Sequence, residues 1–294
     1  MFLLFMKLVG APLFLVAATL AARRWGGTVG GLIVALPMIS GPISVFLALE
    51  DGAAFAVRAG IGSLTGTLAL AFFGFVYAVV CPKGRLLAVV AGLTAFAVSS
   101  VFFSHLNLSL VALFTLTAVC IVLLGCMTPV SRQVGPTRGP LKYDLLLRVL
   151  LMVAMTLAVT EAAPFLGPTV SGVLSSLPLM ALTMALFAQR DGKNVAEAQK
   201  VMKGLVTGLM STAVFYLVLP TVLTDEHLVF GYGAASLAAV LLQCAVLFMI
   251  QRKSSIWQCV NRTVTTVKSR KQCGRYGLRG KAGIGKGTKE NRLR

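Results

Sequence analysis

The residues of this chain that could do chemistry are few, and they lie inside long apolar runs. Lys7 is embedded in the apolar run 2–22, and Glu161 lies near the end of another, 145–163. A charge within a bilayer is costly and by default marks an ion pathway or a binding site. The two groups are expected at a similar depth, so they could meet. The blander interpretation is that each reaches toward the headgroups.

Two apolar runs, 30–49 and 169–188, each contain a proline beside hydroxyl groups. Proline lacks an amide hydrogen and clashes with the preceding helical turn, so it interrupts a helix and frees backbone carbonyls. Interrupted helices at matching places in two halves of a chain point to a transporter site near the bilayer midplane. The alternative is a pair of kinks that only shape packing. The candidate substrate-binding residues are Lys7, Pro37, Ser40, Gly41, Glu161, Ser175, Ser176 and Pro178.

Acidic and basic residues follow both interrupted runs. Asp51 and Asp191 end them, and Arg58 and Lys200 come about two turns into the next helix. Each acid and base could form a gating ion pair at one membrane face. Helix capping by the aspartate, with the base anchored at the interface, is the interpretation that we prefer.

The composition requires these residues to be positioned by membrane helices. The chain has 294 residues, of which 57% are hydrophobic and 12% charged, and its mean hydropathy is +0.88. Soluble domains are less apolar and about twice as charged, and roughly 20 apolar residues span a bilayer as a helix. We expect an all-α polytopic protein with about nine spans, at 2–22, 30–49, 59–80, 86–104, 108–128, 145–163, 169–188, 205–223 and 228–250.

The basic residues of the loops predict the orientation. With the N-terminus outside, Arg23, Lys83, Arg132 and Lys193 fall on the cytoplasmic side, together with the C-terminal tail. This agrees with the positive-inside rule, and the sequence therefore predicts an N-out, C-in topology.

An internal repeat relates the two halves at an offset of 141 residues. Residues 26–37 align with 167–178, and six of these twelve positions are identical. The same offset places Lys7 on Arg148, and slightly shifted offsets pair Asp51 with Asp191 and Arg58 with Lys200. Five predicted spans separate the copies. Because five is odd, the halves are expected to be inverted, which is a transporter architecture.

The predicted organisation is a first membrane repeat at 1–128, a cytoplasmic linker at 129–144, a second repeat at 145–250 and a basic tail at 251–294. A five-plus-five design would have ten spans, and the second half lacks a counterpart of 108–128. Either the tail replaces that helix, or the end of the chain was altered. The tail carries 13 of the 27 Lys and Arg residues, and we expect it to be disordered and to contact anionic lipid.

Other classes of function find little support. The chain lacks metalloprotease and serine-hydrolase motifs, and its two histidines lie in predicted outside links, so we expect no enzyme, cofactor or metal site. The stretch 280–287 resembles a phosphate-binding loop, but Gly287 replaces the magnesium-binding Ser or Thr. The six cysteines form no paired motif. The tail lacks a repeated basic–aromatic pattern, which argues against nucleic-acid binding.

The phrase formed by residues 31–37 with Ser40, followed by Asp51 and Gly52, resembles small bacterial inner-membrane proteins of the GlpM-like kind. That resemblance implies a bacterial inner membrane and says nothing of a substrate.

We expect a secondary transporter or permease for a small solute or ion. The alternative is a scaffold or lipid-handling membrane protein that transports nothing. The expected partners are the bilayer and the unidentified solute, and homo-oligomer formation stays open.

Overall fold

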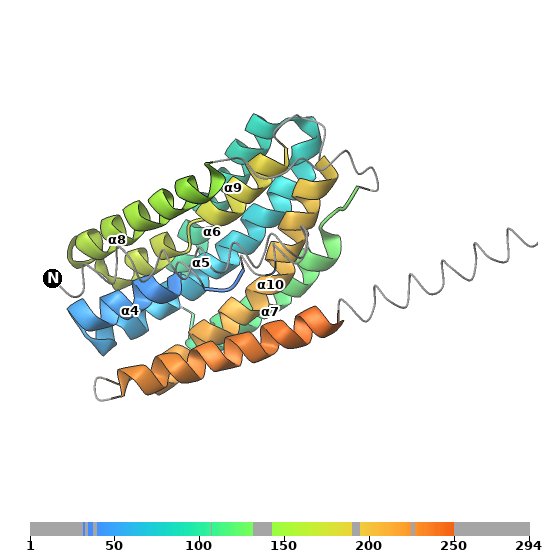
Figure 1. Cartoon of the computed structure of the whole chain (residues 1–294). Helices are drawn as coiled ribbons and strands as arrows, with labels where there is room; N and C mark the ends of the chain where they lie inside the picture. Colours follow the sequence, from blue (N-terminus) through green and yellow to red (C-terminus); the bar gives the residue numbers. More distant parts are fainter. Residues whose placement is uncertain are drawn as a thin grey trace, which may run out of the picture. The chain divides into compact units, whose positions relative to one another are not determined.

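The computed structural model describes residues 32, 35–37, 40–106, 108–131, 143–189, 195–224 and 227–249, and within them all regular structure is helical (Figure 1). The predicted span 2–22 lies outside these residues. Within the span predicted at 30–49, residues 30, 31, 33, 34, 38 and 39 also lie outside them. The helices are α4 (Ser40–Asp51), α5 (Ala53–Val80), the short 3-10 helix η2 (Cys81–Lys83), α6 (Arg85–His105), α7 (Leu110–Met127), α8 (Asp144–Ser175), α9 (Leu179–Ala188), α10 (Val195–Val222) and a further helix at Leu228–Met249.

Six helical segments of the described residues are long and apolar enough to cross a membrane. Three of them, at α6, α7 and Leu228–Met249, bury less than a third of their most apolar window inside the protein. Side chains such as Leu86 and Val229 are 76% and 89% exposed. A soluble protein rarely exposes apolar surface on this scale. The chain is therefore a multi-pass membrane protein whose outer helices face lipid, while the number nine stays a prediction.

Helix α5 lies at the centre of the described helices and packs against α4, α6, α7, α8 and α10. Its sequence permits this because small residues recur along it, and Ala56, Ala59, Gly62 and Ser63 are all buried. Small side chains let helix backbones approach closely where lipid supplies no hydrophobic drive for association. Helix α10 likewise packs against several helices, α5, α7 and α9. Helices α5 and α10 are therefore called the two hub helices.

The chain departs from helical geometry at the prolines that the sequence singles out. Residues 35–37 form a turn and bends ahead of α4, with residues 38 and 39 outside the described part of the chain, and residues 176–178 separate α8 from α9. Helix α8 has a further kink at Gly167, whose φ of 75° and ψ of 167° are not helical. Pro168 disfavours helical geometry at the residue before it, and only glycine adopts that backbone conformation without strain.

The helices extend beyond the predicted apolar spans. Helix α5 begins at Ala53 and α10 at Val195, ahead of the spans predicted from 59 and 205. Hydropathy marks where a helix enters lipid, while its hydrogen bonds continue through polar residues such as Arg58 and Lys200. The kink at Gly167 lies between the spans predicted at 145–163 and 169–188, and a second break follows at 176–178.

Two glycines make matching contacts on the two hub helices. A Cβ placed on Gly66 of α5 would lie 2.6 Å from the Ser176 Cβ and 3.2 Å from the Val173 carbonyl oxygen. A Cβ placed on Gly208 of α10 would lie 2.6 Å from the Ala35 Cβ and 3.1 Å from the Leu32 carbonyl oxygen. Each hub helix therefore presses a glycine against a proline interruption.

The close contact of α5 with α8 gives a first prediction. A methyl group on Gly172 would press on the Ala59 carbonyl and lie 2.8 Å from the Ser63 nitrogen, so backbone would have to move. We expect Gly172→Ala to lower the free energy of unfolding by about 1–3 kcal/mol or more, measured by denaturant titration in lipid–detergent micelles. Gly233→Ala is the control, since no atom lies within 4 Å of its added Cβ. Equal stability of the two variants would contradict the packing.

Candidate functional site

Both proline interruptions line one cavity between α5, α8, α9 and α10. The cavity volume is about 50 Å³. A water molecule needs roughly 10–15 Å³ by this measure, so the cavity has room for about three to five waters or for one small ion. The described lining residues are Ala35, Leu36, Pro37, Ser40, Thr67, Leu70, Ser175, Ser176, Leu177, Pro178, Met180, Ala181, Leu205, Leu209 and Thr212.

Twelve of these fifteen residues occur in pairs that are 141 or 142 positions apart. The offset of 141 relates the lining residues of the two interruptions, and the offset of 142 relates those of α5 and α10. The pairs are Ala35 with Ser176, Leu36 with Leu177, Pro37 with Pro178, Ser40 with Ala181, Thr67 with Leu209, and Leu70 with Thr212. The lining residues therefore lie at the sequence offsets at which the repeat is predicted.

The second interruption is held to α5 by hydroxyl groups. The Ser63 Oγ donates to the Gly172 carbonyl at 3.1 Å and lies 3.2 Å from the Ser175 Oγ. The Ser176 hydroxyl in turn donates to the Ser63 carbonyl at 3.2 Å. The bond to Gly172 satisfies a carbonyl that the interruption frees from helical bonding, since the Ser176 amide donates to Val173 instead, and lipid could not do this.

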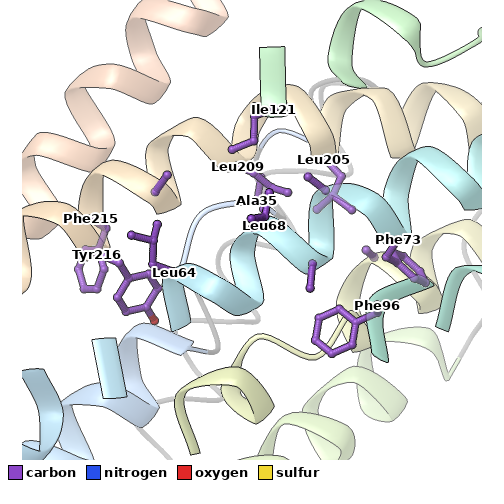
Figure 2. Packing of buried hydrophobic residues seen from close by; sticks show 14 of the residues in the cluster. Ala35, Leu64, Leu68, Phe73, Phe96, Ile121, Leu205, Leu209, Phe215 and Tyr216 are labelled. Carbon is purple, nitrogen blue, oxygen red and sulfur yellow. The ribbon is translucent and has the colours of Figure 1, made fainter. Parts of the chain in front are cut away.

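The first interruption is held by other helices. The Thr212 hydroxyl of α10 donates to the Ala35 carbonyl, and the Gln243 amide donates to the Leu32 carbonyl at 2.6 Å. Figure 2 shows Ala35 beside the core side chains Leu68 of α5 and Leu209 of α10.

The Tyr216 hydroxyl of α10 is buried among serine hydroxyls. Tyr216 is 0% exposed, and its hydroxyl lies close to the hydroxyls of Ser40, Ser63 and Ser175, from α4, α5 and α8. Four helices thus direct hydroxyl groups to one place beside the cavity, where Ser40 and Ser175 form part of its wall.

The structure brings five of the predicted substrate-binding residues to this cavity. They are Pro37, Ser40, Ser175, Ser176 and Pro178. Gly41 is buried in the first turn of α4 and donates to the Pro37 carbonyl at 2.8 Å, without reaching the lining.

Glu161 is exposed on α8 and is not among the lining residues, and Lys7 lies outside the described residues. The described lining carries no charged side chain. An ionic interaction between Lys7 and Glu161 stays a prediction, and the cavity wall itself is neutral.

The predicted gating or capping residues lie elsewhere. Asp51 is the last residue of α4, and the N-cap of α5 is Gly52, with a φ of 89° and no side-chain cap bond. Gly52 takes a backbone conformation that favours glycine, and the capping role of Asp51 stays a prediction. Arg58 is exposed. Lys200 pairs with Glu197 of its own helix at 3.3 Å, and Asp191 lies outside the described residues.

Sequence reasoning missed the cavity residues of the two hub helices. Ser63, Thr67, Thr212 and Tyr216 stand on helices that read as ordinary apolar spans. The repeat matched Thr65-Gly66 with Thr207-Gly208 and so related α5 to α10, but it could not indicate which face meets the interruptions.

The bond from Thr212 to Ala35 can be tested by removing one hydroxyl. Thr212→Val keeps the shape of the side chain but leaves the Ala35 carbonyl without its donor. We expect the free energy of unfolding to fall by about 1 kcal/mol, measured by the same micelle titration. Thr207→Val is the control because the Thr207 hydroxyl donates to Lys203 of its own helix. An equal or smaller effect at Thr212 would contradict the interhelical bond.

No family model, curated protein or solved structure matches this chain. The resemblance to GlpM-like proteins accordingly stays a prediction, and the function has to be argued from the cavity.

Proposed function

We propose that this chain is a secondary transporter or permease of a small solute or ion, which binds between the interrupted helices of two repeats. The observation that carries this proposal is that Pro37 and Pro178, 141 residues apart, line one cavity with Ser40, Ser175 and Ser176. Discontinuous helices that meet between repeats are the usual way in which transporters form a site within the bilayer.

The paired lining and the matching glycine contacts support the duplication. Ser176 corresponds to Ala35 at the offset of 141, and the Cβ of each would lie 2.6 Å from a Cβ placed on the glycine of the other half's hub helix. A two-fold relation between the halves accounts for this exchange of contacts. Chance matching of apolar sequences would not produce reciprocal packing.

In this proposal the halves are inverted, with the N-terminus outside and the C-terminus in the cytoplasm of a bacterial inner membrane. An inverted pair can open the site alternately to the two faces of the membrane by a rocking motion around a central site.

The second candidate function is a membrane scaffold that transports nothing, favoured by the close glycine packing of α5 against α8. The two candidates differ in whether flux depends on the cavity.

The orientation can be tested with single cysteines in a cysteine-free background. Lys83 and His105 are exposed at opposite ends of α6. We expect an impermeant maleimide to modify His105→Cys on intact cells, and Lys83→Cys only after the membrane is opened. Labelling of Lys83→Cys alone on intact cells would reverse the proposed orientation.

Transport can be tested with purified protein in proteoliposomes, using a panel of amino acids, organic anions and inorganic ions. For any solute that is taken up, we expect Pro37→Ala and Pro178→Ala to reduce flux at least about tenfold, about 1.4 kcal/mol at the transport barrier. Alanine restores an amide hydrogen and removes the clash that interrupts the helix.

Ser100→Ala is the control for a buried substitution away from the cavity. Ser100 is buried in α6, where its hydroxyl donates to Ala97 of its own helix and lies outside the cavity lining. The flux through the Ser100→Ala variant should equal the flux through the unchanged protein. Absence of any flux, or flux that both proline variants leave intact, would favour the scaffold.

A further inference from the structure

The end of the helix bundle that holds η2 is fastened by side-chain hydrogen bonds. Pro82 has no amide hydrogen, so the Ala78 carbonyl near the end of α5 lacks the amide donor that a continuing helix would supply. The Gln199 side chain of α10 donates to this carbonyl at 2.9 Å. The proline therefore frees a backbone group of α5, and a glutamine from another helix satisfies it.

A second glutamine, Gln189, follows α9 directly and fastens the same end. Its side-chain oxygen accepts from the Tyr77 hydroxyl at 2.9 Å, and its side-chain nitrogen donates to the Cys81 carbonyl at 3.4 Å. The Gln199 oxygen accepts from the Ser131 amide, in the segment after α7, at 2.8 Å. Each oxygen and nitrogen of the two glutamine side chains thus has a partner. We call the side chains of Tyr77, Gln189 and Gln199 the clasp, and all three are at most 3% exposed.

The clasp lies on the same elements that form the cavity, farther toward η2. Leu70 of α5, Ala181 of α9 and Leu205 of α10 line the cavity. The clasp residues come six to eight positions from them along the chain, which is roughly 10 Å in a helix. Between the two, a Cβ placed on Gly74 of α5 would lie 2.8 Å from the Val206 Cγ2 and 3.4 Å from the Leu205 Cδ2 of α10. The cavity is therefore closed toward η2 by a close-packed layer and then by the clasp.

The opposite ends of α5 and α10 meet differently. The positions that the predicted repeat places opposite Gln189, Gln199 and Tyr77 are Ala48, Val57 and Leu219, whose side chains form no hydrogen bonds. A Cβ placed on Gly60 of α5 would lie 3.6 Å from the Pro220 Cγ of α10, which is ordinary van der Waals contact. The Tyr232 hydroxyl donates to the Ser44 carbonyl at 2.6 Å, but this bond joins α4 to the helix at Leu228–Met249. Hydrogen bonds thus fasten α5 to α10 at the η2 end, and apolar contact joins them at Gly60.

We propose that the clasp is a gate, which closes the cavity toward the η2 end and has to open before a solute passes there. Alternating access requires that a central site open to one face of the membrane at a time. A buried polar network whose members are all satisfied is rigid, so it holds this end shut more firmly than apolar contact alone. In the orientation proposed above, the η2 end faces the cytoplasm. This inference rests on the proposed transport function.

Capping of the end of α5 is the competing role for the same hydrogen bonds. If the clasp only caps α5, its loss loosens the last turn of that helix and leaves the cavity sealed by the layer at Gly74. If the clasp is a gate, its loss exposes the cavity to reagents from the η2 side. Thiol labelling at the clasp and in the cavity distinguishes the two roles.

Cys81 reports on the clasp itself, because it is 2% exposed and its carbonyl accepts from Gln189. The other five cysteines are replaced by alanine, and the purified full chain is treated with N-ethylmaleimide in detergent. Methionine keeps the length of a glutamine side chain without its hydrogen bonds. We expect Gln189→Met and Gln199→Met each to speed the labelling of Cys81 by about tenfold, through easier local opening.

Gln243→Met is the matched control for the labelling of Cys81. Gln243 is also a glutamine that is 3% exposed, and its side chain also donates to a backbone carbonyl, that of Leu32, at 2.6 Å. Because this bond lies at the first interruption, the variant should leave the labelling rate of Cys81 unchanged. Equal acceleration by all three variants, or none by the two clasp variants, would overturn the clasp as a closure.

Access to the cavity separates a gate from a cap. Ser175 lines the cavity, and Ser175→Cys is made the only cysteine, with and without Gln199→Met. A small, membrane-impermeant methanethiosulfonate is applied to intact cells and to inside-out vesicles. From the face at which Lys83→Cys is labelled, we expect Gln199→Met to speed the reaction of Ser175→Cys by about tenfold. Faster labelling of Cys81 with no gain at Ser175→Cys would show a cap and overturn the gate.

Proteoliposome flux separates this inference from the proposed function. Faster labelling of Ser175→Cys with no flux of any solute would support closure of the cavity by the clasp and contradict transport. Flux that depends on Pro37 and Pro178, with no gain at Ser175→Cys, would overturn the gate and leave a transporter. The absence of both would overturn both.

Discussion

A helix that is interrupted inside a bilayer leaves backbone groups that lipid cannot satisfy, and this fold is arranged around two such interruptions. Their freed carbonyls find donors on neighbouring helices, at Ser63 for the second interruption and at Thr212 for the first. Such bonds require close approach. That requirement explains the glycines at positions 66 and 208, where any larger side chain would collide with the interruption.

The sequence predicted the features that depend on residue type. Apolar runs located most of the membrane helices, and Pro37 and Pro178 located the interruptions, because proline acts through local geometry. The sequence could not place Tyr216 or Thr212 at the cavity. The face of an apolar helix that meets a neighbouring helix depends on how the two halves pack together. Gly52, between α4 and α5, has a positive φ that only the structure shows. The apolar runs did not locate the first residues of α5 and α10, because hydropathy does not report helix continuity through polar residues.

The central claim is that the second interruption is held against α5 at the cavity, and disulfide cross-linking in native membranes tests it most directly. The Ser63 and Ser175 hydroxyl oxygens lie 3.2 Å apart, so Ser63→Cys with Ser175→Cys in a cysteine-free chain should cross-link rapidly under mild oxidation. The pair Ser100→Cys with Ser175→Cys serves as the control and should not react. A Ser63–Ser175 pair that stays reduced, or that reacts no faster than the control, would contradict the arrangement of the two halves around the cavity.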